Sequence, residues 1–267
     1  MALSGNTMTT DNRIDLFAEH FQSEMEMISS AQFRHGRTGF DRSAVYKRLL
    51  FCCLIGTVSD VIPPPSGPGA PGNRGEKNKW KFLAAIRLFG DWPDHKRISR
   101  PYLEKLLSFT SKPLFEPVKK HIKTLPPWPQ NSIVTSAYDL EPNWFEANWP
   151  KKAEGQPEKI DNKKGESWSF QDLRHDHLFY GFRHKLVHEL RALNPEEAIS
   201  QDLGTPYYHK GRDLTEHPVR HYWQLKHPPG FVYNLAKRIL RGIVADFRSR
   251  QVDPGLALWS EPYWSDF

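Results

Sequence analysis

Apolar residues recur at steps of three or four along several segments of this chain, and this spacing commits most of it to amphipathic helices. Side chains spaced in this way form one stripe on a helix, and the stripe is buried against another element. The spacing predicts helices over residues 11–30, 41–62, 77–112, 168–193 and 230–250. We therefore expect an all-α helical bundle. Length alone leaves one large domain or two small ones open, and we expect one main helical core with insertions, formed as a single domain over residues 1–267.

Two insertions separate these predicted helices. Residues 113–167 are rich in proline and in aromatic residues, which predicts an irregular insertion that packs onto the helical core and ends in a basic loop. Residues 195–229 interleave aromatic and cationic residues, a pattern that suits single-stranded nucleic acid because rings stack on bases and cations follow phosphates. A short hairpin or loop whose aromatic residues cap the bundle is the alternative for this second insertion.

The composition of the chain limits its possible partners and its cellular compartment. Lys and Arg outnumber Asp and Glu by 37 to 31, and the net charge of +6 favours phosphate-rich partners, although an ordinary basic surface would have the same balance. Cys52 and Cys53 are adjacent within an apolar segment, which indicates buried thiols and not a disulfide or a metal site. No apolar run approaches the length of a membrane span, and the start lacks a secretory pattern, so we expect a cytoplasmic protein with no membrane partner.

Arg183 and His188 lie five residues apart in the helix predicted over 168–193, with His184 beside the arginine. At about 100° per residue, Arg183 and His188 diverge by about 140° around the helix axis, whereas His184 lies one turn before His188. The sequence contains no phosphate-cradling glycine loop, paired-cysteine zinc pattern or Gly-x-Ser-x-Gly elbow. We therefore expect any chemistry to come from these three side chains.

Histidine exchanges a proton near neutral pH, and arginine presents a planar fork of donors to phosphate oxygens. Together they suit the cleavage of RNA. One imidazole takes the proton of the 2'-hydroxyl, and the guanidinium stabilises the charge that develops on the phosphorane. This route needs no metal or cofactor, and it does not cleave DNA, which lacks the 2'-hydroxyl.

The segment Arg183-His184-Lys185-Leu186-Val187-His188 resembles the R-x4-6-H signature of the HEPN superfamily (higher eukaryotes and prokaryotes nucleotide-binding domain). In that signature a polar residue follows the arginine, and His184 occupies the position. Residues 39–50 and the segment that begins Phe231-Val232-Tyr233 also resemble bacterial members. The resemblance covers the predicted core helices but neither the proline-rich middle nor the C-terminal tail.

The resemblance implies an all-α, HEPN-like helical bundle that forms a homodimer, with the motif helices of two copies facing each other across one cleft. Many members are metal-independent endoribonucleases of toxin–antitoxin or anti-phage defence systems and leave a 2',3'-cyclic phosphate. It makes Arg183 the residue that binds the scissile phosphate, His188 the acid or base, and His184 a supporting residue. It also implies RNA, tRNA included, as the substrate and an antitoxin or sensor protein as a partner. We expect the substrate to contact Lys185, Tyr207, Tyr208, Lys210 and Arg212.

Two alternatives stay open. His177, His184 and His188 lie along one helical face, which allows a metal pair at His184 and His188 in a metal-dependent hydrolase, with Asp176 or Glu189 as an oxygen ligand. Alternatively, the helix belongs to a non-catalytic RNA-binding or dimerisation module, and its histidines bond to partner groups. EDTA sensitivity of any cleavage separates the first alternative from the metal-free mechanism.

Overall fold

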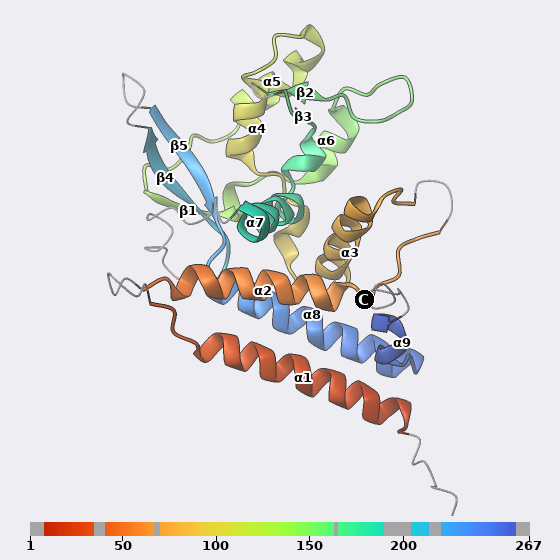
Figure 1. Ribbon diagram of the computed structural model, residues 1–267. Helices are drawn as coiled ribbons and strands as arrows, with labels where there is room; N and C mark the ends of the chain where they lie inside the picture. The colour runs from red at the N-terminus through yellow and green to blue at the C-terminus, as the bar shows by residue number, and fades with distance from the viewer. Residues whose placement is uncertain are drawn as a thin grey trace, which may run out of the picture. The chain divides into compact units, whose positions relative to one another are not determined.

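The computed structural model describes residues 8–34, 41–66, 70–162, 165–189, 204–213 and 220–259. This part of the chain is mostly helical and includes a small antiparallel sheet (Figure 1). The chain divides into two compact units, of which the first comprises Met1–Trp92, Arg183–Ile199 and Pro229–Phe267 and the second Pro93–Phe182 and Ser200–Pro228. Within the ranges given above, no helix has the length and hydropathy that a membrane crossing requires.

The first unit is built around α8, Pro229–Arg250. Helices α1 (Thr10–Ser30), α2 (Ser43–Ser59) and α3 (Arg74–Phe89) pack against it. The short helix α9, Pro254–Trp259, follows α8 and contacts α1. In Figure 1, α1, α2 and α8 lie side by side. The stripe predicted for α8 is buried, and it comprises Phe231, Leu235, Ile239, Ile243 and Phe247.

Helices α3 and α8 approach each other closely at Gly242. A Cβ atom added to this glycine would lie 2.7 Å from the Cβ atom of Phe89, so any larger residue would push the helices apart. At the end of α3, the Arg238 Nε–H donates a hydrogen bond to the carbonyl of Gly90 at 2.7 Å. These contacts fix α3 against the helix on which the first unit is built.

The second unit consists of shorter elements. Its helices are α4 (Arg100–Leu107), α5 (Glu116–Lys123) and α6 (Pro142–Asn148). Strands β1 (Ile133–Thr135), β4 (Tyr207–Asp213) and β5 (Arg220–Lys226) form an antiparallel sheet in the order β1-β4-β5. Strand β2 (Ile160–Asp161) pairs with β3 (Ser167–Trp168). Single turns of 3₁₀ helix lie at Pro93–Lys96, Pro113–Phe115, Ser136–Tyr138 and Phe170–Leu173.

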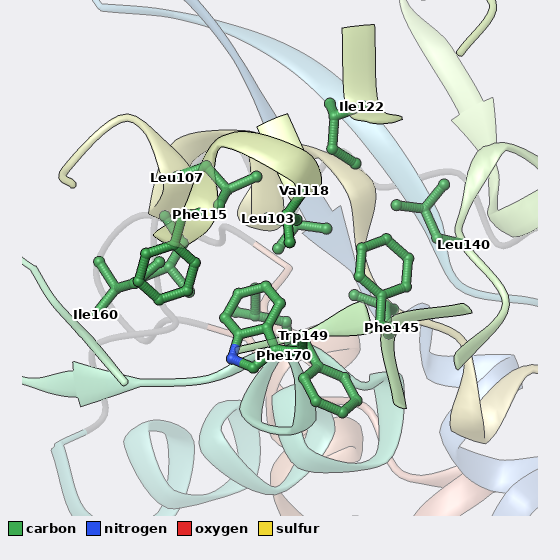
Figure 2. Close-up of a cluster of buried hydrophobic side chains, with 13 residues drawn as sticks. Leu103, Leu107, Phe115, Val118, Ile122, Leu140, Phe145, Trp149, Ile160 and Phe170 are labelled. Atoms are coloured by element: carbon green, nitrogen blue, oxygen red, sulfur yellow. The ribbon is translucent and has the colours of Figure 1, made fainter. Parts of the chain in front are cut away.

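A cluster of buried side chains forms the core of the second unit (Figure 2). Within it, the rings of Phe115 and Trp149 meet edge to face with centroids 5.3 Å apart. The Trp149 Nε1–H donates to the carbonyl of Glu158 at 2.8 Å, so the indole satisfies its one donor inside the core. The proline- and aromatic-rich segment is therefore ordered by a hydrophobic core to which it contributes many of the side chains.

Helix α7, His175–Glu189, carries the boundary between the two units, since residues up to Phe182 belong to the second and those from Arg183 to the first. The predicted helix over 168–193 is therefore shorter at its start, where a separate 3₁₀ turn occupies Phe170–Leu173. Residues 190–193 lie outside the described ranges.

The predictions of helices over 11–30 and 230–250 are confirmed by α1 and α8, and α2 lies within the predicted 41–62. Within residues 77–112 the sequence predicts a stop at Gly90 and Pro93 and a second helix that begins after Ser99, and the structure confirms this break. Helix α3 ends at Phe89 and α4 begins at Arg100, because Asp91 has a positive φ of 42° and Pro93 follows it.

The all-α prediction is wrong in part. Residues 195–229 contain the β4–β5 hairpin, which confirms the hairpin kept open as an alternative for this insertion, and residues 113–167 contain short helices and strands instead of a wholly irregular insertion. Tyrosine and tryptophan favour strands. Strand β4 also pairs with a neighbour on each side, and this pairing stabilises it although its sequence does not alternate strictly between apolar and polar residues. The division into two compact units also differs from the single domain that we expected.

Candidate active site

Helix α7 carries the whole Arg183–His188 motif. Its apolar positions Phe179 and Leu186 are 0% and 1% exposed, which sets how the helix is rotated about its axis. His184, Lys185 and His188 are consequently exposed to solvent. The prediction that helical spacing separates a polar face from a buried stripe thus holds for these positions.

Arg183 lies on another side of the helix and is half-buried. It lines a pocket of about 220 Å³ in the first unit, together with Cys53, Gly56, Thr57, Ser59, Asp60, Asn78 and Phe82. Its guanidinium carbon is 5.8 Å from the centroid of the Phe82 ring, and Nη2 would be 3.4 Å from a Cβ atom on Gly56. The absence of a side chain at Gly56 therefore lets the guanidinium lie against α2.

His184 and His188 lie together, as expected for residues one helical turn apart. The centroids of their rings are 4.7 Å apart, and both side chains are exposed. Neither histidine lines the pocket of Arg183. A single copy of the helix thus presents two adjacent imidazoles to solvent and places the arginine toward α2 and α3, in agreement with about 140° of angular divergence.

His177 does not complete a metal site with these two histidines. His184 lies seven positions further along the chain, which corresponds to about 10 Å along the helix axis, whereas zinc–nitrogen bonds are about 2 Å long. Its Nδ1 lies 4.0 Å from Oδ1 of Asp172 instead. Among the residues that the structure places, no group of three His, Cys, Asp or Glu side chains could hold a metal ion. His177 therefore does not join His184 and His188 in one metal site.

Only some of the side chains predicted to contact the substrate are exposed to solvent. Tyr207 and Tyr208 are 2% and 0% exposed, contrary to the expectation that their rings stack on bases, because β4 is the central strand of its sheet. Lys210 is half-buried, and its Nζ lies 6.0 Å from the centroid of the Trp223 ring. Lys185 is exposed on α7, and the side chain of Arg212 lies outside the described part of the structure.

A buried polar network in the second unit was not found from the sequence. The Asp139 carboxylate lies at its centre, with Oδ2 2.6 Å from Nε2 of His175, and both side chains are 0% exposed. The Tyr208 hydroxyl donates to Asp139 Oδ1 at 2.8 Å and lies 2.8 Å from Oγ of Ser99. The backbone N–H of Arg100 also donates to Oδ1, at 3.0 Å. Burial and the adjacent carboxylate raise the pKa of Tyr208 well above its usual value.

This network joins the start of α4, the turn before Leu140, the start of α7 and strand β4. No spacing rule connects Asp139 with His175 or with Tyr208, so no sequence signal could have located it. Because none of its side chains reaches solvent, we assign it a structural role: it holds the N-terminal end of α7 in place.

The two cysteines are expected to be unreactive in the folded protein. Burial raises the pKa of both thiols, and the charge of Arg183 opposes this only in part, so the protonated form dominates at neutral pH. We expect native protein to react slowly with an aromatic disulfide reagent at pH 7, with Cys53 reacting before the fully buried Cys52. Both should react promptly in urea, and rapid reaction of two thiols in the native protein would contradict this burial.

No protein-family model, curated protein or solved structure matches this chain. The function is therefore inferred from the side chains described above and from the motif in which they occur.

Proposed function

We propose that this protein is a metal-independent endoribonuclease that uses Arg183, His188 and His184. The observation that carries the proposal is the pair of exposed, adjacent imidazoles on the helix that also carries Arg183. Exposed imidazoles are accessible to a polymeric substrate, and two of them supply both partners for acid–base catalysis. The same three residues belong to the segment that resembles the HEPN signature, and this resemblance supports the same reaction.

In the proposed reaction, one imidazole accepts the proton of a 2'-hydroxyl, and the resulting oxygen nucleophile attacks the adjacent phosphorus. The bond from phosphorus to the 5'-oxygen breaks, and the 5'-oxygen takes a proton from the second imidazole or from water. The products are a 2',3'-cyclic phosphate and a 5'-hydroxyl. The Arg183 guanidinium stabilises the charge on the phosphorane through two parallel hydrogen bonds, and such a donor contributes about 10²- to 10³-fold to the rate.

We further propose that the active form is a homodimer through the motif helices. One copy directs its arginine toward α2 and α3 while its histidines face solvent. An isologous interface between two such helices repeats both residue types across a twofold axis, so a phosphate could meet the arginine of one copy and the histidines of the other. A toxin or anti-phage effector of this kind would be regulated by an antitoxin or sensor protein.

One experiment tests the reaction. Purified protein is incubated with total RNA and tRNA in the presence of EDTA, and the new ends are analysed. We expect cleavage that EDTA does not inhibit, with 2',3'-cyclic phosphate and 5'-hydroxyl ends, and none of single-stranded DNA or of RNA with 2'-O-methyl groups. Intact RNA after incubation with a folded, dimeric preparation would overturn the proposal, as would 3'-hydroxyl products.

A non-catalytic RNA-binding or dimerisation module is the second candidate. It is favoured by the packing of Arg183 between Gly56 and Phe82, since such a contact also stabilises a helix without any chemistry. In that case Arg183→Lys, which retains the charge and most of the aliphatic stem, would keep RNA binding and dimer formation, and neither wild type nor variant would cleave RNA.

A further inference from the structure

Three aromatic side chains from separate segments meet beside the sheet of the second unit. Trp128 lies 6.0 Å from Tyr138 and 5.3 Å from Trp223 between ring centroids, with interplanar angles of 30° and 35°. Tyr138 is 39% exposed, and the two tryptophans are half-buried. We call Trp128, Tyr138 and Trp223 the aromatic platform. The two tryptophans pack against the buried cluster of Val134, Tyr208 and Leu225, and their rings are tilted and only partly open to solvent. Partly exposed aromatic rings are the groups on which nucleic-acid bases stack.

The central ring of the platform is held rigidly. The Trp128 Nε1–H donates to Oε2 of Glu104 at 2.9 Å, and the guanidinium carbon of Arg100 lies 4.7 Å from the ring centroid. Arg100 is only 5% exposed and donates to Glu104 Oε1 at 2.8 Å and to the carbonyl of Pro126 at 2.7 Å. Because these bonds exist before any ligand arrives, binding does not have to order the tryptophan.

A cation lies beside the platform. Lys210 of β4 pairs with Trp223 of β5 in the strand register, and its Nζ is 6.0 Å from the ring centroid. In the part of the chain that the structure describes, no carboxylate forms an ion pair with Lys210. The ammonium group is therefore placed to contact a phosphate next to a stacked base, which distinguishes this surface from one that binds neutral peptides.

We propose that the aromatic platform binds single-stranded RNA, with bases on Tyr138 and Trp223 and a phosphate on Lys210. As a substrate-binding surface it rests on the proposed ribonuclease function, but its binding is measurable without cleavage. It replaces the predicted contacts of the buried Tyr207 and Tyr208 with rings that solvent reaches. The recognition is by stacking and charge, so it tolerates any base sequence.

The test uses the full chain and a fluorescently labelled, mixed-sequence 2'-O-methyl RNA, which cannot undergo 2'-hydroxyl attack. Dissociation constants are measured by fluorescence anisotropy at several salt concentrations. We expect Tyr138→Ala and Trp223→Leu each to weaken binding on the order of tenfold. Lys210→Ala should weaken binding and reduce the slope of log K against log salt by about one.

Tyr222→Ala is the matched control. Tyr222 is 40% exposed and precedes Trp223 in β5, but successive strand residues point to opposite faces, and its ring lies against Gly211. We expect this variant to bind like wild type. Circular dichroism and urea unfolding establish that each variant is folded, and the exposed Tyr138 provides a test even if Trp223→Leu unfolds the hairpin.

Three results would overturn the platform: no binding by wild type at low salt, equal binding by all folded variants, or preferential binding of a proline-rich peptide that the same substitutions abolish. Equal binding by all variants leaves the ribonuclease proposal intact, since cleavage is assayed separately. Conversely, platform-dependent binding by a protein that never cleaves RNA contradicts the ribonuclease and supports the platform.

Discussion

His188→Ala is expected to lower the rate of RNA cleavage by about 10²- to 10⁴-fold, the range that positioned acid–base groups contribute. Because His188 is exposed, the substitution should change the free energy of unfolding by no more than about 0.5 kcal/mol. The measurement is single-turnover cleavage of end-labelled tRNA with urea unfolding of the same preparations. His20→Ala, which removes an exposed histidine from α1, is the control and should cleave like wild type. Equal rates for both variants would remove His188 from the mechanism.

The dimer gives this first prediction a sharper form. Arg183→Gln and His188→Ala should each cleave far more slowly than wild type, yet a mixture of the two should regain cleavage, because a mixed dimer still holds one arginine and one histidine at one site. Mixing either one with the double variant should restore nothing. If the mixture cleaves as slowly as its components while subunits demonstrably exchange, one copy supplies the whole site and the composite cleft is wrong.

Asp139→Ala is expected to lower the free energy of unfolding by about 3 to 5 kcal/mol, which is the typical cost of removing one partner of a buried pair. His175 would lose its carboxylate partner at 2.6 Å and Tyr208 one of its two acceptors, and both side chains are beyond the reach of water. Urea unfolding followed by circular dichroism measures the loss. Asp246→Ala, whose carboxylate makes an ion pair with Arg250 at the surface, should cost less than about 1 kcal/mol. Similar losses for the two variants would contradict the network.

Tyr208→Phe isolates one bond of the same network and should cost about 1 to 3 kcal/mol. The raised pKa of Tyr208 also makes the free energy of unfolding of the wild-type protein depend on pH. Because the pKa of Tyr208 is raised on folding, the protonated phenol favours the folded state, and this contribution is complete below a pH of about 10 and lost above it. Wild type should therefore lose more of its stability above that pH than Tyr208→Phe does.

Local spacing alone determined the long helices and the directions of the motif residues. The stripes of α1 and α8 need no knowledge of their partners, because any helix with those positions must bury them. Likewise, the angular divergence of about 140° between Arg183 and His188 follows from helix geometry. This divergence implies that a single helix cannot easily bring both side chains to one atom. The exposure of His184 and His188 agrees with it.

Only the tertiary structure decided which polar and aromatic residues are buried. Tyr207 and Tyr208 resembled ligand-binding rings, but the pairing of β4 with two neighbours buries both. Asp139 and His175 are 36 residues apart, and Trp128, Tyr138 and Trp223 come from three segments, so their meeting depends on the packing of the second unit. Periodicity reports on neighbours within one element, whereas contacts between elements depend on the whole sequence at once.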